Sequence, residues 1–332
     1  MLCNILIMPL FGLGVWNYNV NFLREFQEKL YNHLDVLEFV SGHSLLILHG
    51  LPKPYTLHVR RVDPHVEDTR QFNLAVPEEV EEGIRKHEPY LINGPLVVSF
   101  HLGFSAVDVG KMYVGYCRRC YAVSKPLSRE ETLSTINRSL DIIRQYFKNI
   151  GVRTRLALEN LDYYPDYFGN PSYKSPYHWV CDPDFINEIF DQNPDFWLLL
   201  DIGHAQITAI TKYKATPSTI KEKTIDYIFQ LPLEKTVEIH VNGITWDPKK
   251  GVLIDSHKDL CEWEHLDILG CVLDQRGVNP IVIIYEPRVL GPKDLGWFSR
   301  DFAALTDFLK DKGILESTYE LPPILKKYIK EN

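Results

Sequence analysis

The sequence repeats one pattern eight times: a short apolar run, then a loop, and usually a segment whose apolar residues recur at helical spacing. Runs such as LVVSF (96–100) and IVIIY (281–285) are apolar on both faces, which is typical of parallel strands that are covered on each side. The eight runs lie at residues 4–10, 34–40, 55–59, 95–103, 154–160, 196–203, 236–243 and 280–287.

Helix signals separate these runs. Ser128 and Glu131 have the spacing of a capping box, and the apolar residues that follow keep a helical period until Gly151, so the sequence predicts a helix over 128–151. Comparable signals stand at Asp182–Pro183, at Thr216–Pro217 and in the segment 299–313, which ends at Gly313. Strand and helix are therefore expected to alternate along the chain.

Eight β/α units in 332 residues predict an α/β fold, a (β/α)₈ TIM barrel with long loops on its C-terminal face. We expect one domain over residues 1–332, with the barrel at about 1–313 and a C-terminal tail at 314–332. An open doubly wound sheet is the alternative, but FGLGVW (11–16) has only part of the glycine pattern of a dinucleotide-binding turn. The surplus length falls in the connections 60–94, 104–127, 161–181 and 243–262, which are expected near the catalytic face.

Composition narrows the classes of partner. A net charge of −8 and a pI near 5.9 argue against nucleic acid, which usually meets a basic face. The sequence has no run of 18 or more apolar residues, so it predicts no membrane span. Pro9, Gly12 and Gly14 interrupt the apolar N-terminus, which favours a first strand over a signal peptide.

Six cysteines are scattered through the chain, as expected for reduced thiols in a cytoplasmic protein. Cys117 and Cys120 form one CxxC pair. We interpret it as an incidental pair on an exposed turn, with a thiol metal site or a redox pair as the alternatives.

Imidazoles and carboxylates stand at the C-terminal ends of six successive predicted strands and in the loop after the seventh. In a barrel these ends meet in one mouth, where so many carboxylates are costly unless cations neutralise them. The nine candidate metal ligands are His58, His101, Glu159, Asp201, His204, His240, Asp255, His257 and Glu286.

Nine ligands exceed the number that one zinc or one octahedral ion takes, so two or three metal ions are predicted. The set holds no cysteine, and its mixed nitrogen and oxygen ligands suit iron, manganese or zinc. Tyr163, Trp246 and Trp263 lie in or beside the predicted rim loops. They are candidates for substrate binding, or they pack only within their own loops.

The order of the nine residues resembles the metal-site pattern of the xylose-isomerase-like barrel superfamily, in the arrangement of endonuclease IV. The phrases HLGFSA, ENLDYYP, DPDFINEI, LLLDIGHAQITA, EIHVNG and DSH are most similar to the multinuclear non-haem iron-dependent oxidative enzymes, the family of the methanobactin biosynthesis oxidase. The likeness covers roughly residues 55–290. It departs at His204, where many members carry asparagine and the nuclease pattern has histidine.

The resemblance implies two or three iron ions, which with O₂ remodel a cysteine of a peptide or small thiol-containing substrate. It also implies a small partner protein that presents the peptide. A zinc-dependent phosphodiesterase similar to endonuclease IV is the main alternative, because the ligand order suits it equally. A sugar isomerase or epimerase and a non-enzymatic metal-binding module also stay open.

Overall fold

Eight parallel strands close into a barrel in which each strand pairs with the next barrel strand along the chain. The computed structural model describes residues 8–15, 30, 33–39, 54–59, 72–114, 117–167, 170–247, 252–260, 264–289 and 292–329. The TIM-barrel prediction is confirmed. The strands are β1 (Leu10–Val15), β2 (Val36–Phe39), β3 (Tyr55–Val59), β4 (Val97–His101), β7 (Arg155–Glu159), β8 (Trp197–Asp201), β9 (Thr236–Val241) and β12 (Val282–Tyr285).

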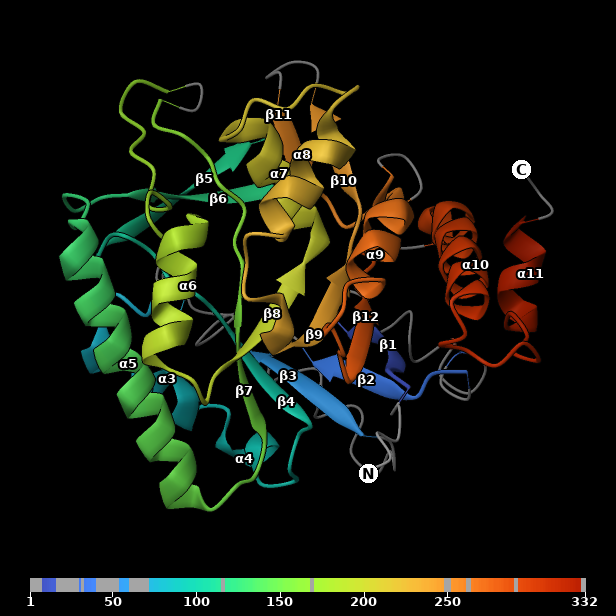
Figure 1. Cartoon of the computed structure of the whole chain (residues 1–332), viewed down its shortest axis with the longest axis horizontal. Coiled ribbons are helices and arrows are strands. Elements are labelled where there is room, and N and C mark those ends of the chain that lie inside the picture. The colour runs from blue at the N-terminus through green and yellow to red at the C-terminus, as the bar shows by residue number, and fades with distance from the viewer. Residues whose placement is uncertain are drawn as a thin grey trace.

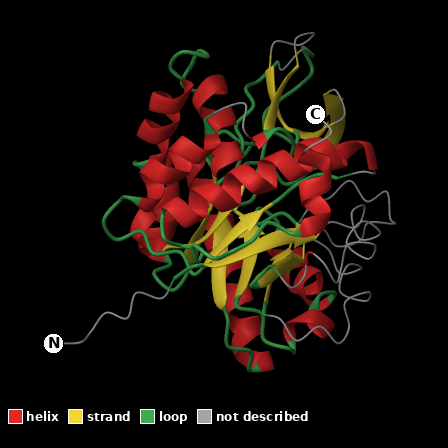
Figure 2. Ribbon diagram, turned by 90° about the vertical axis from the view of Figure 1, so that its right-hand side faces the viewer, coloured by secondary structure: helices red, strands yellow, loops and turns green. Residues whose placement is uncertain are grey.

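Helices surround the strands, as Figures 1 and 2 show. Side chains between this outer layer and the barrel form the main apolar core, and two smaller apolar clusters fill the barrel interior. The helices are α3 (Pro77–Arg85), α4 (Glu88–Leu91), α5 (Arg129–Ile150), α6 (Pro183–Gln192), α7 (Ile202–Thr211), α8 (Ile220–Ile228), α9 (His265–Leu273), α10 (Leu295–Asp311) and α11 (Pro323–Ile329), with 3₁₀ turns η1 (Leu233–Lys235) and η3 (Pro292–Asp294). No helix among the described residues is long and apolar enough to cross a membrane.

Local sequence signals place several helix ends. Ser128 accepts a hydrogen bond from the Glu131 amide at 3.1 Å, and Glu131 accepts one from the Ser128 amide at 2.8 Å, so the predicted capping box is present. Gly151 ends α5 in the left-handed region. The expected start at Thr216 was wrong, because this residue lies in a turn and α8 begins after Thr219.

Two antiparallel hairpins occupy long connections on the predicted catalytic side. They are β5 (Val109–Val114) with β6 (Cys117–Ala122), and β10 (Ile244–Asp247) with β11 (Val252–Asp255). Cys120 is buried in β6, so the expectation of an exposed turn was wrong for this residue. Tyr173 covers the strand there and donates a hydrogen bond to the Cys120 carbonyl at 2.9 Å.

The first strand lies later than the sequence indicates. Residues 4–7 of the predicted run lie outside the described residues, whereas β1 covers Leu10–Val15. Its glycines have low strand propensity, but parallel pairing with β12 on one side and β2 on the other holds the segment extended. A single domain over the whole chain stays a prediction.

His265 gives the fold a metal-independent response to pH. The ring is fully buried, which lowers its pKa to about 3, and a polar contact with the Leu260 backbone opposes this shift only in part. The histidine of the unfolded chain has a pKa near 6.5, so above that pH burial of the neutral ring carries no protonation cost. Below it, the free-energy cost of keeping the buried ring neutral grows as the pH falls toward 3. In urea titrations of the metal-free protein from pH 7 to pH 5, wild type should lose about 2 kcal/mol relative to His265→Met. An unchanged difference between the two proteins would contradict this account.

Candidate metal centre

The barrel brings all nine predicted ligands together, and all nine are buried. Five of them end strands or sit one residue before the end: His58 on β3, His101 on β4, Glu159 on β7, Asp201 on β8 and His240 on β9. His204 lies in the first turn of α7 and Glu286 directly follows β12, while Asp255 ends β11 and His257 follows it.

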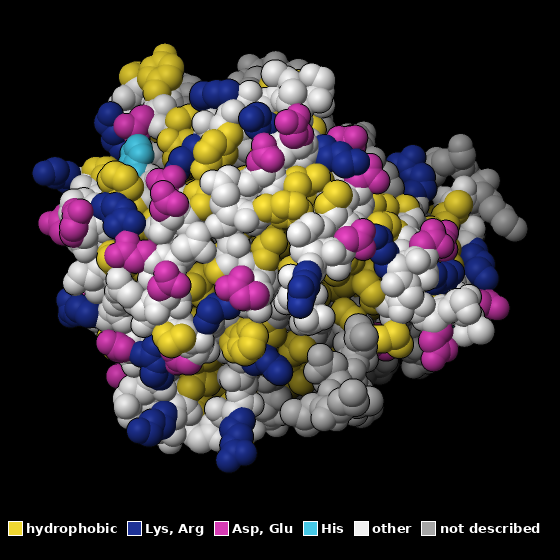
Figure 3. All heavy atoms as spheres, in the orientation of Figure 1, with side chains coloured by type: hydrophobic (Ala, Val, Ile, Leu, Met, Phe, Trp, Pro, Cys, Tyr) yellow, Lys and Arg dark blue, Asp and Glu magenta, His cyan; other side chains and the backbone are white. Residues whose placement is uncertain are grey.

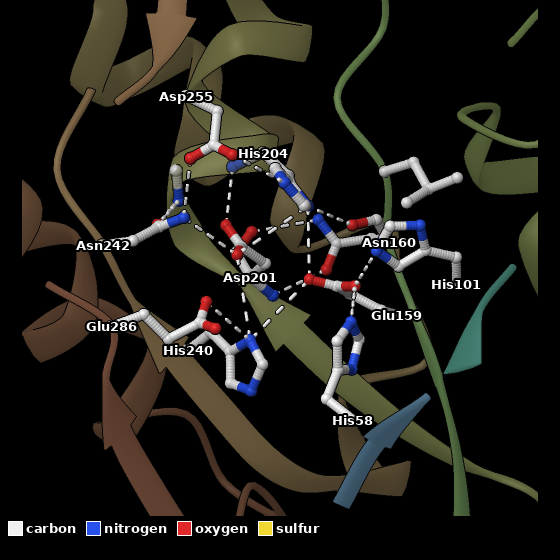
Figure 4. A network of polar contacts seen from close by, with 12 residues as sticks. His58, His101, Glu159, Asn160, Asp201, His204, His240, Asn242, Asp255 and Glu286 are labelled. Atoms are coloured by element: carbon white, nitrogen blue, oxygen red, sulfur yellow. Dashed lines mark hydrogen bonds and ion pairs between the residues drawn. The ribbon is translucent and has the colours of Figure 1, made fainter. Parts of the chain in front are cut away.

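Glu159 lies at the centre of the cluster (Figure 4). One carboxylate oxygen, Oε2, is 3.3 Å from Nε2 of His58 and 3.1 Å from Nε2 of His101. The other oxygen, Oε1, is 3.4 Å from Nδ1 of His204 and 3.7 Å from Nδ1 of His240. The two oxygens thus face two different sets of imidazoles, which is the geometry of a bridging carboxylate.

The remaining residues continue the network around the mouth. Nδ1 of His240 is 3.1 Å from Oε2 of Glu286 and 4.0 Å from Oδ2 of Asp201. Asp255 contacts Nε2 of His257 at 2.9 Å and Nε2 of His204 at 3.8 Å. Three groups of described residues have ligand atoms within 4.8 Å of one another and could each hold a metal ion: His58, His101 and Glu159; Glu159, Asp201 and His240; and Glu38, His240 and Glu286.

Outer partners fix the direction of several imidazoles. Nδ1 of His58 is 2.7 Å from the Ser99 hydroxyl. Nδ1 of His204 meets the Asn160 carbonyl at 2.9 Å, and Nδ1 of His257 meets the Glu286 carbonyl at 3.0 Å. These contacts leave each Nε2 directed at a carboxylate of the cluster. Metal-binding histidines are commonly held in this way through the second ring nitrogen.

Two asparagines hold Asp201 and Asp255 in place, and the sequence motifs gave neither asparagine a role. Asn160 exchanges two hydrogen bonds with the main chain of Asp201, at 2.8 and 3.0 Å. Asn242 donates to Asp201 at 3.1 Å and to Asp255 at 3.0 Å. Each directly follows or closely follows a strand-end ligand in the sequence, which is the signal that could have found them.

Without cations, the electrostatics of the cluster depend on burial and on the mixture of charges. Burial opposes ionisation of Glu159, but His58, His101 and His204 hold its pKa well below the usual range. Burial raises the pKa of Asp201 to about 7, and repulsion from Glu159 and Asp255 adds to the rise against the pull of His204. Although burial disfavours charged imidazoles, the neighbouring carboxylates raise the pKa values of His204 and His240 well above normal.

The donor set fits hard or borderline divalent cations. Both carboxylate oxygens of Glu159 and Nδ1 of His240 are buried without a hydrogen bond among the described residues. Buried polar atoms rarely lack such partners, and a cation between them would satisfy all three atoms together. Nitrogen and oxygen donors without thiolate suit iron, manganese or zinc.

Gly203 gives a direct test of the support for these carboxylates. Its amide donates a hydrogen bond to Asn242 Oδ1 at 3.1 Å, and a Cβ at this position would lie 2.2 Å from the same atom. Gly203→Ala should therefore displace Asn242 and weaken metal binding by about 10-fold, the scale of an outer-partner loss. Titration with a competing chelator would measure this, with Gly270→Ala on α9 as the control, because a Cβ there makes only ordinary van der Waals contacts. Unchanged affinity in Gly203→Ala would contradict the role of Asn242.

The three residues predicted to bind substrate differ in their exposure. Tyr163 is partly buried against the main core, and Lys212 lies over its ring at 5.2 Å. Trp246 is exposed on β10. Trp263 lies outside the described residues. Substrate binding by these three residues stays a prediction.

The sequence pattern of a known enzyme family matches residues 93–292, which is more than half of the chain. The family is described as the RiPP precursor modification enzyme MbnB/TglH/ChrH, where a RiPP is a ribosomally made peptide that is modified afterwards. The chain belongs to this family. The resemblance inferred from the sequence motifs is thereby confirmed, and this MbnB/TglH/ChrH family member is an enzyme with a barrel able to bind metal.

Solved structures support the fold of this family member. A D-tagatose 3-epimerase-like protein is 17% identical with a TM-score of 0.57, over 92% of this chain and 100% of that one. The IOLI protein with a bound zinc atom is 12% identical with a TM-score of 0.52, over 91% and 98%. An AP endonuclease of family 2 from Brucella melitensis is 14% identical with a TM-score of 0.50, over 88% and 99%. No protein of curated function matches the chain in sequence.

Proposed function

We propose that the enzyme is an oxidase that holds two or three iron ions and uses O₂ to modify a cysteine of a RiPP precursor peptide. The proposal is supported mainly by one observation: this member of the family has a buried cluster of nine imidazoles and carboxylates. The nine predicted ligands would hold the ions, with Glu159 shared between two of them. Iron(II) with open coordination positions would supply the electron transfer and the O₂ chemistry.

The chain's own residues would position and shield this chemistry. Ser99, Asn160 and the Glu286 carbonyl keep three imidazoles directed at the cluster, while Asn242 spaces Asp201 from Asp255. The ligands are almost inaccessible to water, which would protect reactive species from side reactions. In this proposal the peptide thiol provides the electrons and O₂ receives them, and a small partner protein presents the peptide.

A zinc-dependent phosphodiesterase is the second candidate, favoured by one observation. His204 lies between the Glu159 and Asp255 groups, at 3.4 and 3.8 Å, and so could serve a third metal as in the nuclease pattern that it resembles. The charge distribution argues against this function. On the face in Figure 3, basic and acidic side chains are interspersed, and the whole chain carries a net charge of −8.

The deciding assay follows O₂ and peptide mass together. Anaerobic enzyme loaded with Fe(II) is mixed with a cysteine-containing RiPP precursor peptide, and O₂ is then admitted. The proposal expects O₂ consumption and a changed peptide mass, both absent when the cysteine is replaced by serine. Inert peptides, together with cleavage of abasic DNA by the zinc-loaded enzyme, would instead establish the phosphodiesterase.

A further inference from the structure

Glu38 is a fully buried carboxylate on β2 that lies beside the predicted ligands. Main-chain pairing puts it level with Gly14 on β1 and Thr56 on β3. Gly14 leaves room for the side chain of Glu38, because a Cβ at Gly14 would lie 3.3 Å from Oε2 of Glu38 and 3.0 Å from Cγ of Glu286. The barrel therefore contains space for a carboxylate at this level.

The contact of Glu38 is with one imidazole. Its Oε1 is 2.8 Å from Nε2 of His240, an ion-pair contact at the distance of a charge-assisted hydrogen bond. Neither atom has an aligned hydrogen bond to a described residue, so the pair needs only a change of angle to form one. The other ring nitrogen of His240, Nδ1, faces Glu286 at 3.1 Å and Glu159 at 3.7 Å. Glu38 and the candidate metal position thus lie on opposite edges of the same ring.

The ring of His240 is oriented differently from the rings of three other histidines of the cluster. In His58, His204 and His257, the outer partner meets Nδ1 and leaves Nε2 directed at the cluster. In His240 the outer partner meets Nε2, so Nδ1 is the atom available to a metal. A neutral imidazole carries one N–H, and the partner of that N–H decides which nitrogen keeps the lone pair.

We propose that Glu38 is a positioning residue of the metal centre, which accepts the Nε2–H of His240 and thereby presents Nδ1 to a metal shared with Glu159 and Glu286. The inference rests on the proposed metal centre but is independent of the oxidative chemistry. Carboxylate–histidine–metal arrangements of this kind are common, and loss of the outer partner typically weakens metal binding 10- to 100-fold.

A metal on the Nδ1 side would fix which nitrogen of His240 carries the proton. Such a metal requires the lone pair of Nδ1, so the N–H lies on Nε2, where the ionised carboxylate of Glu38 can accept it.

Glu238 provides a matched control within the same barrel interior. It is fully buried and also approaches Nε2 of His240, but at 3.9 Å, and its Oε1 already accepts a hydrogen bond from the Thr56 hydroxyl at 3.0 Å. Glu238→Gln can keep the bond from Thr56. It should therefore change metal binding much less than a comparable change at Glu38.

The test uses the full chain loaded with zinc, which is diamagnetic, and labelled with ¹⁵N-histidine. Glu38→Leu should weaken binding of one metal equivalent 10- to 100-fold in a chelator competition and remove the NMR signature of a histidine bound through Nδ1 with Nε2–H. Glu38→Gln should keep that signature and lose less affinity, because its amide oxygen still accepts the hydrogen bond. Glu238→Gln should match wild type.

Three outcomes would overturn the inference. Retention of every metal equivalent and of the wild-type signature in Glu38→Leu would show that Glu38 positions nothing. Equal loss of a full equivalent in Glu38→Gln and Glu38→Leu would instead make Glu38 a direct ligand. If Glu238→Gln loses as much metal affinity as Glu38→Leu, the effect comes from the polarity of the barrel interior in general and not from Glu38. Failure of wild type to bind zinc would count against the metal centre itself.

Discussion

Replacing Glu159 by alanine is expected to remove at least one metal equivalent and to reduce turnover to below about 1% of wild type. The reason is the position of its carboxylate, whose two oxygens face His58 and His101 on one side and His204 and His240 on the other. Loss of an outer partner alone costs 10- to 100-fold in affinity or activity, so loss of a shared ligand should cost more. Elemental analysis of the purified variant measures the metal, and circular dichroism checks the fold.

The control for this prediction is Glu131→Ala, which disrupts the capping box of α5 without touching the cluster. It should lower thermal stability slightly and leave metal content unchanged. If Glu159→Ala keeps the wild-type metal stoichiometry, the ligands have been assigned to the wrong residues. If both variants lose metal equally, metal loss reflects general destabilisation.

Metal removal should have the second large effect, a decrease of about 6 °C in Tm for each site that is saturated. Free metal at a thousand times its dissociation constant stabilises a protein by about 4 kcal/mol, and an unfolding entropy of about 0.7 kcal/mol/K for a chain of 332 residues converts this into about 6 °C. Without cations, buried carboxylates such as Asp201 and Glu38 need protons, because burial raises their pKa values.

The size of this effect should depend on pH in a defined direction. Asp201 in the metal-free protein has a pKa of about 7, and the pKa values of His204 and His240 are raised. Protons therefore compete with metal as the pH falls through 7, and the difference in Tm should be larger at pH 8 than at pH 6. Calorimetry with and without chelator at the two pH values measures it. A difference that grows toward acid pH would contradict the assignment of these residues as ligands.

The sequence predicted the barrel because its strands are buried on both faces and therefore read as continuous apolar runs. It predicted the nine residues because parallel strands end on one side of a barrel, so residues far apart in the chain converge. Local signals were weaker at β1 and at α8. Main-chain pairing sets the boundaries of β1, and a turn at Thr216 sets the start of α8. Neither feature depends on the pattern of side chains.

Residues that act through another residue were missed. Glu38 precedes the end of an otherwise apolar strand, and only the closed barrel puts its carboxylate against His240 on the far strand β9. Asn242 is similar, because its contacts with Asp201 and Asp255 depend on the path of the β10–β11 hairpin. Glutamate inside an apolar strand and asparagine beside strand-end ligands are signals that could have identified both.

The most direct test of the proposed function is the metal content of protein purified without oxygen, combined with Mössbauer spectroscopy. The account predicts two or three equivalents of iron, held as a coupled cluster whose spectrum changes when a cysteine-containing precursor peptide is added. Two or three equivalents of zinc with no iron, and no response to the peptide, would contradict it.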